Sequence, residues 1–112
     1  MKFSVTIMPK DTAINAPISV LRAIWQGFHD AMNRQKEEGK VQEVYIVPGW
    51  GRFMAIYLVK DAEELWERLN ELPDIGAFNL ESYPLSDFNE GIKVIFKNIE
   101  EAEANFPGTS LK

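Results

Sequence analysis

The sequence predicts an α+β fold: a ferredoxin-like βαββαβ chain whose four-stranded antiparallel sheet carries two helices on one face. Three observations predict it. Four short segments are rich in β-branched and aromatic residues, two longer segments place apolar residues three and four positions apart, and prolines or glycines stand between them. Right-handed crossovers would put both helices on the same side of the sheet.

The chain has 112 residues, which is enough for one domain and too few for two independent cores. Its 46% hydrophobic and 26% charged residues are typical of a globular protein. We therefore expect a single domain over residues 1–112, with the ferredoxin-like core in residues 2–85 and a C-terminal extension in residues 86–112.

The first strand is predicted over residues 2–8, where apolar and polar side chains alternate. The period then changes, and a helix is predicted from Ile18 up to Gly39, with Pro17 in its first turn. A helix of about 20 residues is roughly 30 Å long and should lie along the sheet. Its apolar residues form one stripe, which consists of Ile18, Leu21, Trp25, Phe28 and Met32.

Residues 41–47 and 52–59 are predicted to form an antiparallel hairpin, whose turn at 48–51 contains a proline and two glycines. The turn could fold over the mouth of a pocket, where Trp50 would stack on a ligand and Arg52 would pair with its carboxylate. The alternative is that the glycines serve backbone geometry, Trp50 covers an interface and Arg52 is solvated.

A second helix is predicted from Asp61, which stands three residues before Glu64 in an arrangement close to a capping box. Pro73 ends it, and a fourth strand follows over residues 77–85. The buried stripe of this helix consists of Leu65, Leu69 and Leu72. Beyond the core, the sequence predicts a short strand at Ile92–Phe96 and a helical turn over Ile99–Ala104.

The predicted third strand is apolar on both faces. Met54, Ile56 and Leu58 lie on the face away from the helices, where a two-layer fold should carry polar side chains. Soluble monomers seldom expose so large an apolar surface. The simplest cover is a second copy of the chain, sheet against sheet, with residues 92–96 extending the partner's sheet. The alternative is that residues 92–104 fold back over their own sheet.

Composition excludes several classes of function. A net charge of −5 argues against nucleic-acid binding, and no apolar run is long enough to span a bilayer. The N-terminus does not look like a secretory signal, so we expect a cytoplasmic protein. Without cysteine, and with one histidine, neither a disulfide nor a metal site is expected. We expect no cofactor. A phosphate-binding glycine loop needs a helix that begins directly after it, and no helix is predicted after Gly49-x-Gly51.

The segment of residues 58–85 resembles the second half of the muconolactone isomerase family, in which a helix ending in Leu-Pro leads through a short turn into the last core strand. Here Leu72-Pro73 is the pair and "NLESYPL" is the strand. The resemblance implies a dimeric α+β barrel, often assembled into larger rings, with a pocket between the sheet and helices of each subunit. It also implies cofactor-free movement of a proton next to a carbonyl. The isomerase has a histidine where Trp50 stands, so no catalytic base is carried over to that position.

Three residues are candidates for acid–base chemistry. His29 lies beside the buried stripe of the first helix, and imidazole suits general-base work near neutral pH, although a histidine on a helix flank is more often a surface residue. Glu43 and Glu81 lie on strands that we expect to be largely buried, and burial would raise the pKa of either carboxyl into a useful range.

The tyrosines Tyr45, Tyr57 and Tyr83 could donate hydrogen bonds to an enolate-like oxygen, or they could make ordinary cross-strand contacts. The sequence thus predicts a homo-oligomer that isomerises a small lactone or unsaturated organic acid. Glu43 or Glu81 would move the proton, and Arg52 would hold a substrate carboxylate. The competing hypothesis is a ligand-binding or assembly module without catalysis.

Overall fold

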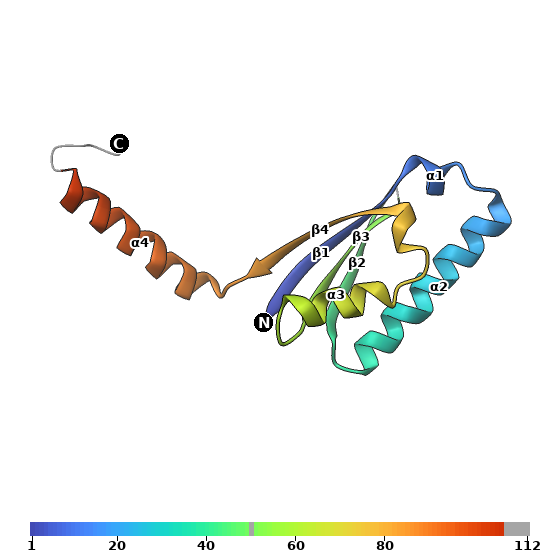
Figure 1. The fold of residues 1–112 in the computed structure, drawn as a ribbon, viewed down its shortest axis with the longest axis horizontal. Coiled ribbons are helices and arrows are strands. Elements are labelled where there is room, and N and C mark those ends of the chain that lie inside the picture. The colour runs from blue at the N-terminus through green and yellow to red at the C-terminus, as the bar shows by residue number, and fades with distance from the viewer. Residues whose placement is uncertain (50, 107–112) are drawn as a thin grey trace.

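The computed structural model describes residues 1–49 and 51–106 (Figure 1). The element order contains the predicted βαββαβ core, extended by two short helical segments and a long C-terminal helix. The elements are β1 (Lys2–Pro9), α1 (Asp11–Ile14), α2 (Ile18–Glu37), β2 (Val41–Val47), β3 (Arg52–Leu58), α3 (Ala62–Asn70), η1 (Ile75–Ala77), β4 (Phe78–Leu85) and α4 (Phe88–Asn105).

The four strands form one sheet in the order β2-β3-β1-β4, with every neighbouring pair antiparallel. Helices α2 and α3 cover the same face of it (Figure 1). The predicted fold class is therefore confirmed. The core between the two layers takes Phe3, Val5 and Ile7 from β1, together with Phe28 of α2 and Leu65 of α3.

A β-bulge in β2 decides which of its side chains face the helices. The register with β3 shifts between Val41 and Glu43, so that Val41 pairs with Tyr57 while Glu43 pairs with Ile56. Val41 is consequently buried on the helix side. The simple alternation of the sequence, which puts Val41 on the same face as Tyr45, is wrong at this one position because the bulge inserts an extra residue.

The turn between β2 and β3 depends on its two glycines. Gly49 has φ +112° and Gly51 has φ +68°, which side-chain-bearing residues rarely adopt. A Cβ on Gly51 would also lie 2.8 Å from Cζ2 of Trp25. These glycines thus serve backbone geometry and close packing on α2. Trp50 itself lies outside the described residues.

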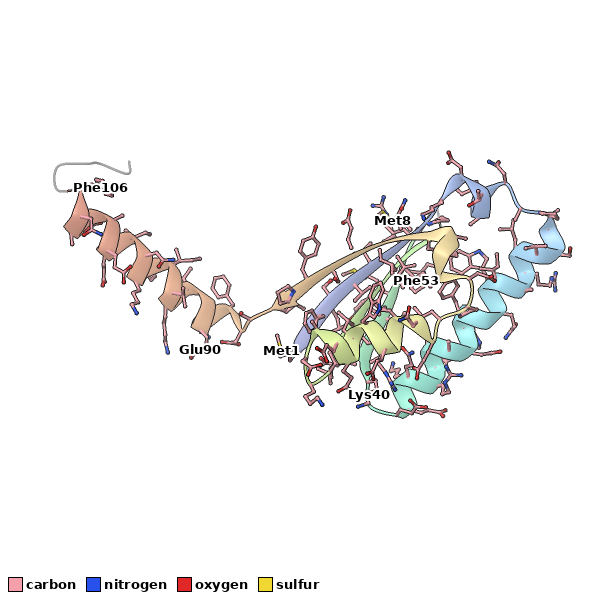
Figure 2. The ribbon with its side chains drawn as sticks, in the orientation of Figure 1. Met1, Met8, Lys40, Phe53, Glu90 and Phe106 are labelled. Atoms are coloured by element: carbon pink, nitrogen blue, oxygen red, sulfur yellow. The ribbon has the colours of Figure 1, made fainter. Side chains whose placement is uncertain are left out.

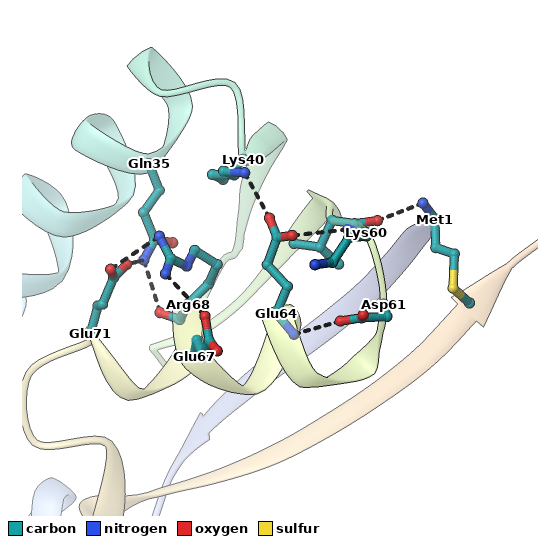
Figure 3. Close-up of polar contacts among 10 residues, drawn as sticks. Met1, Gln35, Lys40, Lys60, Asp61, Glu64, Glu67, Arg68 and Glu71 are labelled. Carbon is teal, nitrogen blue, oxygen red and sulfur yellow. Dashed lines mark hydrogen bonds and ion pairs between the residues drawn. The ribbon is translucent and has the colours of Figure 1, made fainter.

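A buried glutamine ties the two layers together. Gln35 of α2 has no exposed surface, and its Nε2 donates to the backbone oxygen of Arg68 at 2.9 Å and to Oε2 of Glu71 at 3.0 Å (Figure 3). Its Oε1 accepts from the hydroxyl of Tyr57 at 2.6 Å. Burial raises the pKa of Tyr57 well above its usual range, so this hydroxyl remains a donor.

Replacing Tyr57 with phenylalanine should lower the free energy of unfolding by about 1–3 kcal/mol, because Gln35 Oε1 would lose the hydroxyl that it accepts from inside the core. Urea unfolding followed by circular dichroism measures this loss. The matched control is Tyr83→Phe on the exposed side of β4, where we expect a change within about 0.5 kcal/mol. Equal losses in the two variants would contradict the role of the hydrogen bond.

The C-terminal extension is a helix, so the predicted strand at Ile92–Phe96 is wrong. Asp87 caps α4, since its side chain accepts from the backbone N–H groups of Asn89 and Glu90. A short run rich in β-branched and apolar residues suits either structure, and the cap decides for the helix. The helix runs away from the sheet (Figure 1), so the alternative that residues 92–104 cover their own sheet is also wrong.

Candidate functional site

A pocket of about 300 Å³ opens between α2 and the β2–β3 hairpin. It lies where the helix passes over the β2 side of the sheet, and only these three elements contribute to it among the residues described. Its apolar walls and floor come from Trp25, Phe28, Met32, Val44, Ile46 and Phe53. A mainly apolar concavity of this size with a few polar groups is the usual form of a small-molecule site.

The floor of the pocket is held by an aromatic cluster. The ring of Phe28 lies 5.2 Å from that of Phe53 and 4.8 Å from that of Phe78, both edge to face. Trp25 joins them at 6.0 Å from Phe28. These are favourable separations for aromatic pairs. Because the rings come from α2, β3 and β4, the cluster fixes the helix against the sheet beneath the pocket. The position of Phe53 in this cluster can be found by its label in Figure 2.

The polar wall of the pocket comes from one face of α2. His29, Asn33 and Lys36 line it together, since residues four and seven positions apart lie on the same side of a helix. An imidazole, an amide and an ammonium group thus stand along one edge of an apolar concavity. This combination can exchange a proton and can bind a carboxylate or a developing oxyanion.

The contacts of His29 favour one tautomer. Its Nδ1 lies 3.1 Å from Oδ1 of Asp30, which also accepts from Gln26 Nε2 at 3.0 Å. The hydrogen bond with His29, and then that with Gln26, lowers the pKa of Asp30, so this group is a carboxylate and can only accept. Nδ1 therefore carries the proton, and Nε2 accepts from Nδ2 of Asn33 at 3.2 Å.

This arrangement leaves a basic nitrogen accessible from solvent. The side chains of His29 and Asp30 are 68% and 65% exposed in the single chain, so a ligand can reach Nε2 by displacing the amide of Asn33. The paired carboxylate would stabilise the imidazolium formed when Nε2 takes a proton. The site therefore has the parts of a general base.

The other candidates from the sequence lie elsewhere. Cross-strand pairing puts Glu43, Tyr45, Glu81 and Tyr83 on the sheet face that no helix covers, and all four are exposed. The expected burial of Glu43 and Glu81 is therefore wrong for the single chain, because a two-layer fold buries only one face of each strand.

Glu43 and Glu81 are also far apart. They lie on β2 and β4, the two edge strands, so three strand spacings separate them, or roughly 14 Å. They cannot both reach one small substrate within one protomer. Arg52 is exposed at the start of β3, and Tyr57 is buried beneath α2 and bonded to Gln35.

A second cluster of charges surrounds the start of α3 (Figure 3). Lys40 Nζ lies 2.7 Å from Glu64 Oε1, and Asp61 caps the helix by accepting from the backbone N–H of Glu64. The hydrogen bond from Lys40 lowers the pKa of Glu64. These groups satisfy one another, and we assign them a structural role.

No metal site and no membrane span emerge from the described part of the chain. Residues 1–49 and 51–106 contain no group of three or more acidic or histidine side chains placed to hold a metal ion. None of their helices is both long and apolar enough to cross a bilayer.

Sequence reasoning identified His29 but missed Asp30, Asn33 and Lys36. The spacing of His29, Asn33 and Lys36 at four and three residues was a signal, since it places three polar groups on one helical face. The sequence could not show that this helical face borders a pocket, because the pocket forms only where α2 packs on β2 and β3.

Comparison with known proteins relates this chain to one family. The sequence profile described as muconolactone delta-isomerase matches residues 1–90. The fold is similar to the crystal structure of muconolactone isomerase at 3.3 Å resolution, with a TM-score of 0.67 and 20% sequence identity, over 78% of this chain and 90% of that chain. No protein with a curated description matches the sequence. The resemblance seen in residues 58–85 is thereby confirmed.

Proposed function

Because the chain belongs to the muconolactone delta-isomerase family, we propose that it is a cofactor-free isomerase that moves a proton on a small lactone or unsaturated organic acid. The reaction would take place in the pocket between α2 and the β2–β3 hairpin. The observation that carries the proposal is the pairing of His29 with Asp30, which leaves Nε2 as a hydrogen-bond acceptor beside an apolar concavity.

In the proposed reaction, Nε2 of His29 accepts a proton from a carbon conjugated with the carbonyl of the substrate. The electron pair of the broken C–H bond moves into the conjugated system, and negative charge develops on the carbonyl oxygen. The imidazolium then returns the proton to a different carbon. Substrate and product have the same composition, so the step needs neither an oxidant nor a cofactor.

Lys36 would bind the anionic part of the substrate. Its ammonium group lines the same pocket as His29, at the end of α2 nearest to β2. A carboxylate bound there would orient the reacting carbons toward Nε2, and the positive charge would stabilise the enolate-like intermediate. Asn33 could donate to the same oxygen once the ligand has displaced it from His29.

The open sheet face would take part only in an assembly. A second copy placed on it would remove Glu43, Glu81 and Tyr45 from water, as the sequence predicts for a sheet-to-sheet dimer. Arg52 would then hold a carboxylate in that interface. This assembly and a cytoplasmic location stay predictions of the sequence.

The competing function is ligand binding or assembly without catalysis, and it is supported by the exposure of Glu43 and Glu81 in the single chain. Deuterium exchange separates the two functions. The protein is incubated in D₂O with a panel of small lactones and unsaturated acids, and NMR follows deuterium incorporation and rearrangement. Catalysed exchange supports the isomerase. Saturable binding without exchange for every compound bound would overturn it.

Replacing Lys36 with methionine should raise KM for an anionic substrate by roughly 10- to 100-fold, because a charged hydrogen bond to the carboxylate is lost. Steady-state kinetics on the substrate found by the exchange experiment measure this. Arg22→Met is the matched control, since it removes one positive charge from an exposed site on the same helix outside the pocket. A KM that rises equally in both variants would indicate only a general electrostatic effect.

A further inference from the structure

Helix α4 carries an apolar stripe with the spacing of a two-helix seam. Its positions follow one another at intervals of four, three, four, three and four residues. This heptad pattern is the one by which two helices pack along their length. The stripe consists of Phe88, Ile92, Ile95, Ile99, Ala102 and, at the C-cap, Phe106.

Nothing in the described part of the same chain covers this stripe. Helix α4 contains no buried residue, and Phe88, Ile95 and Phe106 are 77%, 53% and 65% exposed. Only Ser86 and Asp87 join the helix to β4, and the helix extends away from the sheet, with Phe106 far from the core (Figure 2). So much exposed apolar surface on one element marks an interaction site.

The family match does not explain this helix. The profile ends at residue 90, whereas α4 begins at Phe88 and continues to Asn105. The stripe is therefore a property of this chain in addition to the shared fold. Its role in assembly does not depend on the proposed isomerase activity.

We propose that α4 packs in antiparallel orientation against α4 of a second copy of this chain. The stripe is nearly symmetric about Lys97, with a phenylalanine at each end and isoleucines near the middle. An antiparallel pair aligns Phe88 with the partner's Phe106, Ile92 with the partner's Ala102 and Ile95 with the partner's Ile99. A two-fold axis through the centre relates the two helices, so each copy presents the same surface.

Charge favours the antiparallel orientation. Residues 88–97 contain two lysines and one glutamate, a net charge of +1, while residues 98–105 contain three glutamates, a net charge of −3. Antiparallel pairing sets the basic half of each helix beside the acidic half of the other. Parallel pairing would set −3 beside −3, which like-charge repulsion disfavours. The helix dipoles also oppose each other only in the antiparallel pair.

The area available is close to that of a small specific contact. A phenylalanine buries about 150–250 Å² when it is fully covered. Phe88 and Phe106 are 77% and 65% exposed, so those of two copies together supply roughly 430–710 Å². The isoleucines of both copies add to this and bring the sum toward the roughly 1,200 Å² at the lower end of stable interfaces.

Disulfide trapping tests both the pairing and its direction. The chain has no cysteine, so each introduced thiol reacts against no background. Full-length Ile95→Cys protein, isotopically labelled, is mixed with unlabelled Ile99→Cys protein and oxidised under native conditions. We expect mass spectrometry to find mainly the mixed 95–99 disulfide, since Cα atoms of bridged cysteines must lie within about 7 Å. Lys97→Cys, on the outer face of the same helix, is the control.

Two results would overturn the proposal. Dominant 95–95 and 99–99 products would indicate a parallel pair. Cross-linking no greater than in Lys97→Cys would indicate that another surface or partner covers α4.

A second measurement avoids thiols. Light scattering over a concentration series should show that Ile95→Glu weakens association about tenfold or more, because the seam would then bury an unpaired carboxylate. Adding Ile99→Lys to the same chain should restore association, since only the antiparallel pair brings the introduced carboxylate of one copy against the introduced ammonium group of the other. An unchanged association curve in Ile95→Glu would also contradict the proposal.

Discussion

Replacement of His29 by glutamine is expected to lower turnover of the isomerised substrate by roughly 10²- to 10⁴-fold, which is the usual contribution of a positioned general base. Glutamine keeps the size and polarity of the side chain but cannot take up a proton. Substrate affinity should change little, because Lys36 and the apolar walls remain. Stopped-flow or NMR turnover, with binding measured separately by calorimetry, provides the test.

Replacing Asp30 with asparagine tests whether this carboxylate positions His29. The hydrogen bond with His29 lowers the pKa of Asp30, so Asp30 is a carboxylate that accepts from Nδ1 of His29. Asp30→Asn should therefore lower kcat while KM and the fold change little, as expected for a positioning residue. Steady-state kinetics separate the two constants, and an equal rise in KM would contradict the positioning role.

An active His29→Gln variant would mean that another group moves the proton, and the remaining candidates lie on the open sheet face. In that case Glu43→Gln and Glu81→Gln should each be assayed, because the sequence predicts that one or the other of these carboxylates moves the proton. Full activity in all three variants would contradict every acid–base role proposed for this chain.

Replacement of Phe28 by alanine should lower the free energy of unfolding by about 3–5 kcal/mol. Phe28 is 2% exposed, and its ring contacts those of Trp25, Phe53 and Phe78, so the truncation removes the centre of the aromatic cluster. Such a loss is a large share of the roughly 5–15 kcal/mol that stabilises a typical domain. Urea unfolding at low protein concentration measures it.

The matched control for Phe28 lies on the same helix. Ile18 is 82% exposed, so Ile18→Ala should change the free energy of unfolding by no more than about 0.5 kcal/mol. A loss below about 1 kcal/mol in Phe28→Ala would mean that the cluster does not anchor α2. The pocket floor would then have no rigid support.

Local sequence signals predicted most of the core. The alternation in residues 2–8, the stripe in the first long helix and the glycine-containing turn each depend on neighbours in the chain, and the corresponding elements form as expected. The stripe is wrong at its first member, because Ile18 stands at the start of α2 and is 82% exposed. The signal failed at residues 92–96, where a short β-branched run fits both a strand and a helix. The capping carboxylate of Asp87 was the better guide.

Burial was predicted less well than secondary structure. Gln35 has charged neighbours in the sequence, yet it is fully buried because the end of α2 meets both Tyr57 and α3. Glu43 and Glu81 lie in apolar strands but on the uncovered face. Neither outcome follows from composition, since each depends on which neighbouring element arrives at that face.

The sequence by itself determined the order of the core elements up to residue 85, most of their apolar faces, the family and His29 as a candidate base, because these depend on patterns among residues close together in the chain. Only the tertiary structure decided that His29, Asn33 and Lys36 border a pocket with Val44 and Phe53, and that α4 has no partner within its own described chain. The physical reason is that a pocket and an uncovered helix result from how whole elements pack, and packing is set by side-chain volumes on several elements at once.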